Sequence, residues 1–470
     1  MARNPRRIVL DNLIEITENN KPSHIVISAS LDLYDGLSVN DRAFVKRMSI
    51  GTLEHKLTLD EIINRFSSVP VVKQKPFIRN VLRFGIYQIL FTNISDPAAC
   101  NEAVILCKKY GLGGLSGFVN GVLRNVARKK TELLSQIQEN IEPPPDDEKS
   151  LSACVKALSF KYSMPEWIVS YFLEHFGFEK TVSSFEYFMK ENMTTICCNR
   201  SRIEPYVLEQ RLKKKTCVVI PVEDAPGCMK ISGYDSLFTL DEFASGLFWV
   251  QDHSSVLAGS IPDDDTIHEY LNERTRSGSL SDGLDSQSCH DDTLRVLDLC
   301  AAPGGKTLNM ADRFKVCGLR SHFTACDITE RKLKLIRDNI ERLRIDNIDV
   351  RMNDATVFNP EFEDRFDIVI ADVPCSGLGV IGKKPDIKYN MTALKQEELV
   401  TLQRGIIENA VRYLHRGGYL VYSTCTVNKH ENEDNAAYIK ELGFKELLSR
   451  QLLPGETGSD GFFYALLKKN

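Results

Sequence analysis

The sequence predicts an α/β protein in which a doubly wound sheet follows an all-α domain and a small α+β subdomain. Three observations support this prediction. Apolar residues recur at helical spacing through the first 138 residues, residues 139–150 show no periodicity, and short apolar runs alternate with amphipathic stretches from residue 294 onward. Such alternation is typical of a parallel sheet with helices on both faces.

The composition indicates an ordinary globular protein. With 470 residues, 43% of them hydrophobic and 26% charged, the chain has room for about two to four domains. No apolar run approaches the ~18 residues of a membrane span and the N-terminus does not look like a signal peptide, so we expect a cytoplasmic protein. The 13 scattered cysteines include no Cys-x-x-Cys pair, which favours reduced thiols and argues against a zinc site.

The charge is unevenly distributed along the chain. The net charge is −5, but residues 1–135 hold 19 Lys and Arg against 12 Asp and Glu. This asymmetry is a hint of a surface that faces a polyanion. The basic residues that crowd the second half of this region are Arg79, Arg83, Lys108, Lys109, Arg124, Arg128, Lys129 and Lys130. A solvated helix face and a surface that holds RNA phosphates explain them about equally well.

Residues 1–138 are predicted to form the all-α domain. Ser38 before Asp41 and Thr58 before Glu61 resemble capping boxes, so we expect helices to begin there. Residues 139–150 contain three consecutive prolines and should form a stiff linker.

Residues 151–245 are predicted to form the small subdomain. Helices are expected near Trp167, from Phe176 to Lys190 and from 205 to 215, with strands at 194–199 and 217–220. The third domain, residues 246–470, contains a segment rich in Asp, Ser and Gly at 263–293. We expect this segment to be a disordered acidic insertion, because it has too few large apolar residues to offset the entropy of ordering.

The C-terminal domain alternates strand and helix. Strands are expected at 295–299, 322–327, 348–351, 366–371, 418–425 and 462–467, and helices from about Lys306, at 330–343, at 394–414 and at 431–441. This order predicts the doubly wound sheet.

A glycine-containing loop, Asp298 to Thr307, follows the first of these strands. Its small residues let a ligand approach the backbone, and the N-terminus of the following helix attracts negative charge such as a carboxylate. The loop matches neither the phosphate-binding P-loop spacing nor Gly-x-Gly-x-x-Gly.

Two acids end the next strands. Asp327 could hydrogen-bond ribose hydroxyls and Asp354 could reach an adenine amino group. Each acid alone is more often a cap or a turn former. At successive strand ends after a glycine loop, they favour a cofactor that contains a nucleoside.

Two thiols are also predicted at strand ends. The buried strand 366–371 leads into Asp372 and Cys375, and Cys425 follows a later strand. Two such thiols beside a carboxylate suit covalent chemistry on an electron-poor ring. An unperturbed thiol has a pKa of ~8.5 and needs activation at neutral pH. Spacing alone does not decide which cysteine is the nucleophile.

Four blocks of the chain resemble the signature blocks of the RNA cytosine-C5 methyltransferases of the Nol1/Nop2/Sun family. They are Asp298 to Thr307, Asp372 to Gly379, Pro385 to Lys388, and Ser423 to Val427 with Glu431-Asn432-Glu433. The all-α domain resembles the antitermination factor NusB. That fusion is typical of the bacterial Sun/Fmu branch, which acts on 16S ribosomal RNA. The resemblance covers nearly the whole chain.

The resemblance implies a Rossmann-like class I methyltransferase domain with S-adenosylmethionine as donor. The residues it implies for cofactor binding are Cys300, Ala301, Ala302, Pro303, Gly304, Gly305, Lys306, Asp327, Asp354 and Asp372. It also implies that Cys425 attacks C6 of the cytosine, that Asp372 stabilises protonation at N3, and that Cys375 assists loss of the C5 proton and release of the RNA. We count Lys306 with these catalytic residues.

Departures and alternatives accompany this interpretation. Gly382-Lys383-Lys384 stands where relatives commonly carry arginines and a histidine, and Val373 replaces a common alanine. The same chemistry on tRNA and a non-catalytic RNA-binding ribosome assembly factor stay open as alternatives. A small-molecule methyltransferase would not explain two cysteines and a basic helical domain. We expect a monomer that uses neither a metal nor a membrane.

Overall fold

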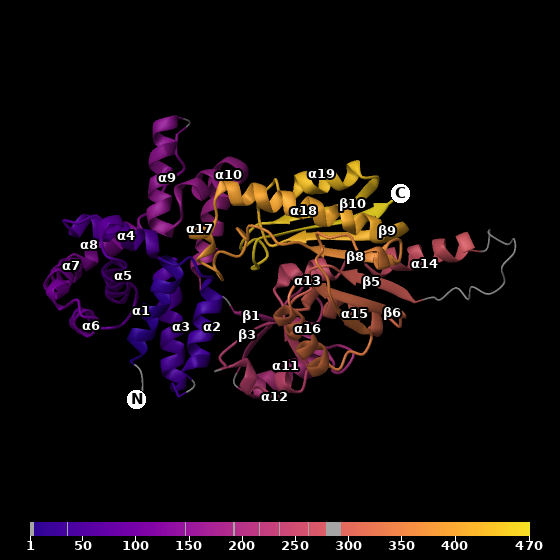
Figure 1. The fold of residues 1–470 in the computed structure, drawn as a ribbon, viewed down its shortest axis with the longest axis horizontal. Coiled ribbons are helices and arrows are strands. Elements are labelled where there is room, and N and C mark those ends of the chain that lie inside the picture. The colour runs from indigo at the N-terminus through magenta and orange to yellow at the C-terminus, as the bar shows by residue number, and fades with distance from the viewer. Residues whose placement is uncertain are drawn as a thin grey trace. The chain divides into compact units, whose positions relative to one another are not determined.

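The structure is a computed structural model of the chain (Figure 1). It describes residues 4–34, 36–145, 147–190, 193–215, 217–234, 236–261, 263–278 and 293–470, without the side chains of 264 and 273–278. The chain forms two compact units. The helical unit contains Met1–Lys190 and Ile381–Met391, and the sheet unit contains Glu191–Val380 and Thr392–Asn470.

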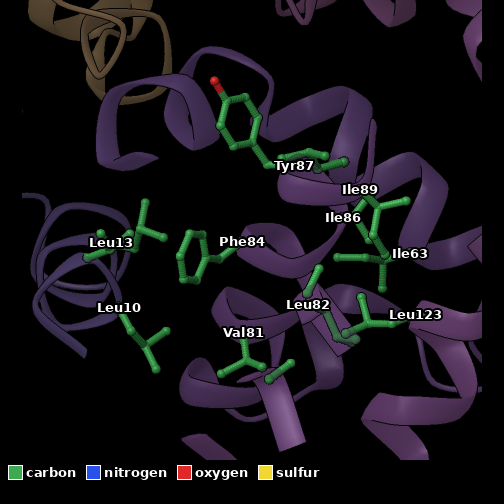
Figure 2. Close-up of a cluster of buried hydrophobic side chains, with 14 of the residues drawn as sticks. Leu10, Leu13, Ile63, Val81, Leu82, Phe84, Ile86, Tyr87, Ile89 and Leu123 are labelled. Atoms are coloured by element: carbon green, nitrogen blue, oxygen red, sulfur yellow. The ribbon is translucent and has the colours of Figure 1, made fainter. Parts of the chain in front are cut away.

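The helical unit is built around a helix that is buried on all sides. Its helices are α1 (Pro5–Thr17), α2 (Ser23–Leu33), α3 (Val39–Glu54), α4 (Lys56–Phe66), α5 (Pro76–Phe91), α6 (Asp96–Lys109), α7 (Ser116–Arg128), α8 (Lys130–Gln138), α9 (Glu148–Tyr162), α10 (Glu166–Met189) and α17 (Ile387–Asn390), with 3-10 turns at Val71–Lys73 and Gly113–Leu115. Every residue of α5 from Val81 to Leu90 is buried. Figure 2 shows Phe84 of α5 facing Leu10 and Leu13 of α1.

Close packing around α5 explains a glycine of α3. A Cβ on Gly51 would lie 2.0 Å from the hydroxyl oxygen of Tyr87. Any side chain at this position would therefore push α3 away from α5, and interiors as dense as protein cores tolerate such insertions poorly.

One of the two predicted helix starts is confirmed and one is wrong. Ser38 is the N-cap of α3 and accepts a hydrogen bond from the backbone N–H of Asp41. Helix α4, however, begins at Lys56, and the hydroxyl of Thr58 donates to the carbonyl of Phe160 at 2.6 Å. Thr58 is fully buried and uses its hydroxyl in a contact with α9, which a local capping pattern cannot reveal.

Two arginines of the predicted basic cluster are structural. Arg83 is buried, and its guanidinium donates to both carboxylate oxygens of Asp60 at 2.6 and 2.8 Å. Arg79 forms an ion pair with Glu18. By contrast, the side chains of Lys108, Lys109, Arg124, Arg128 and Lys129 are exposed.

The segment Ile381–Met391 packs within the helical unit although it lies between two elements of the sheet unit in sequence. Lys388 is 3% exposed, and its ammonium donates to the carbonyl of Glu54 at 2.8 Å. The hydroxyl of Tyr389 donates to the carbonyl of Leu53 at 2.6 Å. Both contacts satisfy carbonyls at the C-terminus of α3, which have no partner within the helix.

The sheet unit begins with a small antiparallel sheet in the order β2-β3-β1-β4. Its elements are β1 (Thr194–Cys198), α11 (Pro205–Lys214), β2 (Val218–Pro221), β3 (Cys228–Ser232), a 3-10 turn at Leu237–Thr239, α12 (Asp241–Ala244) and β4 (Phe248–Val250). The predicted strands at 194–199 and 217–220 and the helix between them are confirmed. Strands β3 and β4 were not predicted.

The large sheet has seven strands in the order β10-β11-β9-β8-β5-β6-β7. Its elements are β5 (Leu294–Asp298), α15 (Gly305–Val316), β6 (Ser321–Asp327), α16 (Glu330–Leu343), β7 (Ile348–Met352), β8 (Phe366–Asp372), α18 (Ala393–Tyr413), β9 (Leu414–Thr424), α19 (Glu433–Glu441), β10 (Phe444–Leu452) and β11 (Phe462–Lys469), with a 3-10 turn at Pro360–Phe362. Five strands from β9 to β7 are parallel, and β11 and β10 are antiparallel.

Helices cover both faces of this sheet, as Figure 1 shows for α18 and α19 on one face and α15 and α16 on the other. Alternate residues of β8 pack on opposite faces: Val369 joins the core under α18, and Ile368 joins the core under α15. A strand buried on both faces is apolar throughout, which is why this strand was predicted as a continuous apolar run. The doubly wound fold class is confirmed.

The predicted disordered insertion at 263–293 is wrong in its first half. Helices α13 (His253–Gly259) and α14 (Asp264–Gly278) precede β5. Ile267 and Tyr270 of α14 are buried, and the hydroxyl of Tyr270 donates to Asp367 at 2.6 Å. Ile267 and Tyr270, with the partly buried Leu271, pack one face of this helix on the core despite its acidic composition. Residues 279–292 lie outside the described part of the chain.

Residues 139–147, in the predicted linker, contain no helix or strand among those described. Among the helices of the described ranges, none combines the length and the apolar character that a bilayer span requires.

Candidate active site

The predicted site residues lie at the carboxyl ends of adjacent parallel strands. Strand β8 lies between β5 and β9, and its last residue, Asp372, pairs with Ser423 of β9. The chain proceeds from β5 through β6 to β7 on one side and from β8 to β9 on the other, so the strand order reverses between β5 and β8. Open α/β sheets bind ligands at such a reversal.

The loop after β5 is held against the ends of its neighbours by backbone hydrogen bonds. The N–H of Leu299 donates to Ile370 of β8 at 3.0 Å, and that of Ala301 donates to Cys326 of β6 at 2.8 Å. Gly304 is the N-cap of α15 with a φ of 110°, a conformation that favours glycine. The sequence Cys300 to Gly305 therefore forms a tight turn that ends at a helix N-terminus.

Asp298 is a site residue for which sequence reasoning gave no role. It is 1% exposed, and its Oδ2 accepts the hydroxyl of Thr307 at 2.6 Å. Its Oδ1 is buried without a hydrogen-bond partner among the described residues. Burial raises the pKa of Asp298 to about 7.

Asp327 ends β6, as predicted, and contacts the glycine-containing loop. Its Oδ2 accepts the N–H of Ala302 at 3.1 Å, and its Oδ1 accepts the ammonium of Lys332 at 2.9 Å. Asp354 follows β7 and caps its own turn, because it accepts both the N–H and the hydroxyl of Thr356. The two acids stand at neighbouring strand ends, where the N–H of Asn353 donates to the carbonyl of Asp327.

Lys306 and Asp372 form an ion pair at the centre of the site. Lys306 is 6% exposed and donates to Oδ2 of Asp372 at 2.7 Å and to the hydroxyl of Ser255 at 3.0 Å. The other oxygen, Oδ1 of Asp372, accepts the hydroxyl of Ser423 at 2.8 Å. The ring of Phe462 lies 4.9 Å from the ammonium. The carboxylate is therefore fixed by two donors.

The structure brings the two predicted thiols together. The sulfur atoms of Cys375 and Cys425 are 3.3 Å apart, although 50 residues separate them in sequence. The hydrogen bond with Cys425 and burial raise the pKa of Cys375 well above its ordinary value. The two sulfur atoms share one hydrogen bond, in which either thiol can be the donor.

Several supporting side chains had no predicted role. Lys306 and Asp372 are contacted by Ser255, Ser423 and Phe462. A fully buried carboxylate, Glu431, contacts the loop that contains Cys375 and the loop that follows Cys425. Ser423 and Glu431 belong to sequence blocks that resemble the family, which is the only signal that singled them out. Burial of a polar side chain cannot be read from local spacing.

Two family models match the chain. The model for the 16S rRNA methyltransferase RsmB/F matches residues 287–468, and the NusB family model matches residues 3–128. These matches confirm the predicted combination of an all-α NusB-like domain with a Rossmann-like methyltransferase domain.

Relatives match over nearly the whole chain. The "Probable ribosomal RNA small subunit methyltransferase B" of Bacillus subtilis is 30% identical over 488 aligned residues, covering 99% of this chain and 98% of that protein. "Ribosomal RNA small subunit methyltransferase B" of Yersinia enterocolitica is 29% identical, covering 93% and 92%.

Solved structures share the fold. The structure titled PH0851 covers 100% of both chains with a TM-score of 0.73 and 22% identity. NSun6 from Pyrococcus horikoshii, solved with SFG, covers 65% of this chain and 98% of its own, with a TM-score of 0.52 and 20% identity. These structures show the fold. The relative from Bacillus subtilis, 30% identical over nearly its whole length, shows that the chain belongs to the ribosomal RNA small subunit methyltransferase B family.

Proposed function

We propose that the protein transfers a methyl group from S-adenosylmethionine to C5 of a cytosine in 16S ribosomal RNA through a covalent cysteine–cytosine adduct. The observation that carries this proposal is the pair of thiols 3.3 Å apart beside the fixed carboxylate of Asp372. Cytosine C5 is a poor nucleophile until addition at C6 breaks the aromaticity of the ring. Two thiols and a carboxylate at one point meet that requirement.

The residues around the glycine-containing loop fit S-adenosylmethionine. The turn Cys300 to Gly305 offers a helix N-terminus to a carboxylate, and Asp327 offers its carboxylate to ribose hydroxyls. The unpartnered Oδ1 of Asp298 is an acceptor that a ligand ammonium could satisfy. Asp354 is available for the adenine amino group. When bound, this cofactor supplies an electrophilic methyl group on a sulfonium.

We assign the bond-making steps to the two cysteines and Asp372. The thiolate of Cys425 adds to C6, and the displaced electron pair is accommodated at N3, where Asp372 stabilises protonation. The resulting enamine makes C5 nucleophilic enough to take the methyl group, and the C–S bond of the sulfonium breaks with its electron pair left on sulfur as a thioether. Cys375 assists removal of the C5 proton, the C5–H electrons re-form the C5–C6 double bond and expel the sulfur of Cys425 as a thiolate, and N3 gives up its added proton. The target base must leave its stack to reach this site.

The two thiols share a hydrogen bond in which either sulfur can be the donor. A donor to the sulfur of Cys425 favours the charged form of that thiol, which is the nucleophilic form. The assignment of Cys425 as the nucleophile rests on the resemblance to the RNA cytosine-C5 methyltransferases.

The other parts of the chain are assigned to RNA binding. We propose residues 1–138 as an RNA-binding domain joined by the linker 139–150 to a small RNA-binding and linking subdomain, 151–245, with residues 246–470 as the methyltransferase domain. Exposed Lys108, Arg124 and Arg128 on α6 and α7 support the first assignment, because cationic helix faces hold RNA phosphates.

A methyl-transfer assay tests the proposal. The purified full-length protein should move labelled methyl groups from S-adenosylmethionine to 16S ribosomal RNA taken from a strain that lacks the enzyme, and bisulfite sequencing should map one modified cytosine. Transfer to tRNA instead would show that the substrate assignment is wrong. RNA binding without any transfer would identify a non-catalytic assembly factor.

A further inference from the structure

We propose that Glu431 is a positioning residue that holds the thiol of Cys375 against that of Cys425. The effect on catalysis rests on the proposed covalent chemistry. The positioning itself is argued from the hydrogen bonds that the buried carboxylate of Glu431 accepts. Glu431 precedes α19, is 0% exposed, and lies six residues beyond Cys425.

Both oxygens of Glu431 accept hydrogen bonds from the two cysteine loops and from α18. Oε2 accepts the backbone N–H of Ser376 at 2.8 Å and the amide of Gln403 at 2.9 Å. Oε1 accepts the amide of Asn428 at 2.9 Å. One carboxylate therefore joins the residue after Cys375 to the loop that follows Cys425.

The backbone on the other side of Cys375 is fixed by the same network. The amide nitrogen of Gln403 that donates to Glu431 also donates to the carbonyl of Pro374 at 2.9 Å. The remaining oxygen of Gln403 accepts the amide of Asn435 at 2.9 Å, which orients the side chain. Pro374 and Ser376 are thus both held, and Cys375 lies between them.

The two cysteines depend on this network to different degrees. Cys425 directly follows β9, whose Thr424 still pairs with Phe463 of β11. Cys375 lies three residues beyond the end of β8, in a loop outside the ladder. The sheet itself places Cys425. The loop of Cys375 is held by backbone hydrogen bonds at Val373 and Gly379, to Ser423 and Cys425, whereas Pro374 and Ser376 on either side of Cys375 are held by the side chains of Gln403 and Glu431.

A carboxylate suits this position better than an amide. All three groups that meet Glu431 are N–H donors, and a carboxylate is an acceptor at both oxygens. A glutamine would turn its NH₂ group toward at least one of these donors. The Glu431→Gln variant keeps the volume of the side chain and breaks the network at one point.

The predicted defect is specific to release of the RNA. If Glu431 places Cys375, the Glu431→Gln variant should still form the adduct through Cys425 but should resolve it slowly. We expect kcat to fall by about 10- to 100-fold, as for a small misplacement of a reacting group, with little change in KM for RNA. The covalent protein–RNA adduct should accumulate on a denaturing gel, as it should for Cys375→Ala.

A matched control separates positioning from general stability. Asp312 is also a buried carboxylate of the sheet unit that holds a loop, because it accepts the N–H groups of Arg200 and Ser201 at 3.1 and 2.9 Å. Asp312→Asn should lower the free energy of unfolding without accumulating adduct. If Glu431→Gln loses activity without adduct, while Cys375→Ala accumulates it, the inference is overturned and the proposed function stands.

A second readout does not depend on the reaction. With diamide as oxidant, Cys375 and Cys425 should form a disulfide that peptide mass spectrometry detects, the two thiols losing two hydrogens that the oxidant takes up. The rate should be lower in Glu431→Gln than in wild type, because the sulfur atoms no longer lie 3.3 Å apart.

The buried pair Cys197 and Cys228, with sulfur atoms 3.0 Å apart, reports general loosening of the same unit. The rate of disulfide formation between Cys197 and Cys228 should be the same in wild type and in Glu431→Gln. An unchanged rate at Cys375 and Cys425, or a parallel change at Cys197 and Cys228, would refute the positioning role. If Cys375→Ala itself accumulates no adduct, the covalent proposal fails, and the disulfide rates still decide the role of Glu431.

Discussion

The ammonium of Lys306 donates to Oδ2 of Asp372 at 2.7 Å, and this lysine is 6% exposed. A buried charge is retained only when it is paired and hydrogen-bonded. Lys306 lies in the first turn of the helix after β5 and Asp372 ends β8, so this ion pair joins the proposed cofactor loop to the proposed catalytic carboxylate.

Replacing Lys306 with Met should reduce methyl transfer strongly. The substitution keeps the length of the side chain but removes a charge-assisted hydrogen bond, which leaves Asp372 held by Ser423. We expect kcat to fall by about 10²-fold, in the range of losing one preorganised donor. The control is Lys334→Met on the exposed face of α16, where the lysine pairs with Asp338. Equal kcat values for both variants and wild type would contradict a role for Lys306.

The two cysteines should give opposite phenotypes. Cys425→Ala should abolish methyl transfer and adduct formation, because no nucleophile adds to C6. Cys375→Ala should accumulate a denaturation-resistant protein–RNA adduct, because release is blocked. Denaturing gels with labelled RNA distinguish the two results. An adduct with Cys425→Ala and none with Cys375→Ala would reverse the assigned roles.

Exposed arginines of α7 should contribute to RNA affinity. Replacing Arg124 and Arg128 with Gln removes two exposed cations, so affinity for 16S ribosomal RNA should fall. The log–log slope of affinity against salt should decrease by about 1 for each phosphate that the protein no longer neutralises. Filter binding at several salt concentrations measures this slope.

Lys129→Gln is the comparison, because Lys129 is paired with Glu132. Arg83 is buried and its guanidinium donates to Asp60. Replacing Arg83 with Met should therefore lower the free energy of unfolding and leave the salt slope of RNA affinity unchanged. An unchanged slope for the double variant would place the RNA surface elsewhere.

Acid should destabilise the helical unit through His55. Burial lowers the pKa of His55 from 6.5 to about 3, and its ring stacks on Phe91 at 3.9 Å. Between pH 6.5 and 3 the unfolded state binds a proton that the folded state does not. The free energy of unfolding should therefore fall as pH decreases through this window, by at most about 1.4 kcal/mol per pH unit from this group.

The His55→Phe variant isolates this contribution. It keeps an aromatic ring against Phe91 and removes the titrating group. The difference in unfolding free energy between wild type and variant, measured by denaturant titration, should be constant above pH 6.5 and should move in favour of the variant below it. A difference that does not change with pH would show that His55 is accessible to protons in the folded protein.

The sequence predicted the elements whose local pattern carries information. The strand at 366–371 is apolar throughout because both of its faces are covered, and its bounds in the structure, Phe366–Asp372, differ by one residue. Strand β10, Phe444–Leu452, was missed because it lies at the edge of the sheet and most of its side chains are exposed, which leaves no apolar pattern.

By itself, the sequence determined the fold class, the strand ends that carry the acids and thiols, and the family, because strand periodicity and motif spacing are local properties. Only the tertiary structure decided which of these groups meet. The 3.3 Å between Cys375 and Cys425, the pairing of Lys306 with Asp372 and the burial of Glu431 depend on strand order and register, which bring together residues far apart in the chain. Lys388 is another such residue. Its buried ammonium needs an acceptor and donates to the carbonyl of Glu54 at the end of α3, more than 300 residues away in sequence.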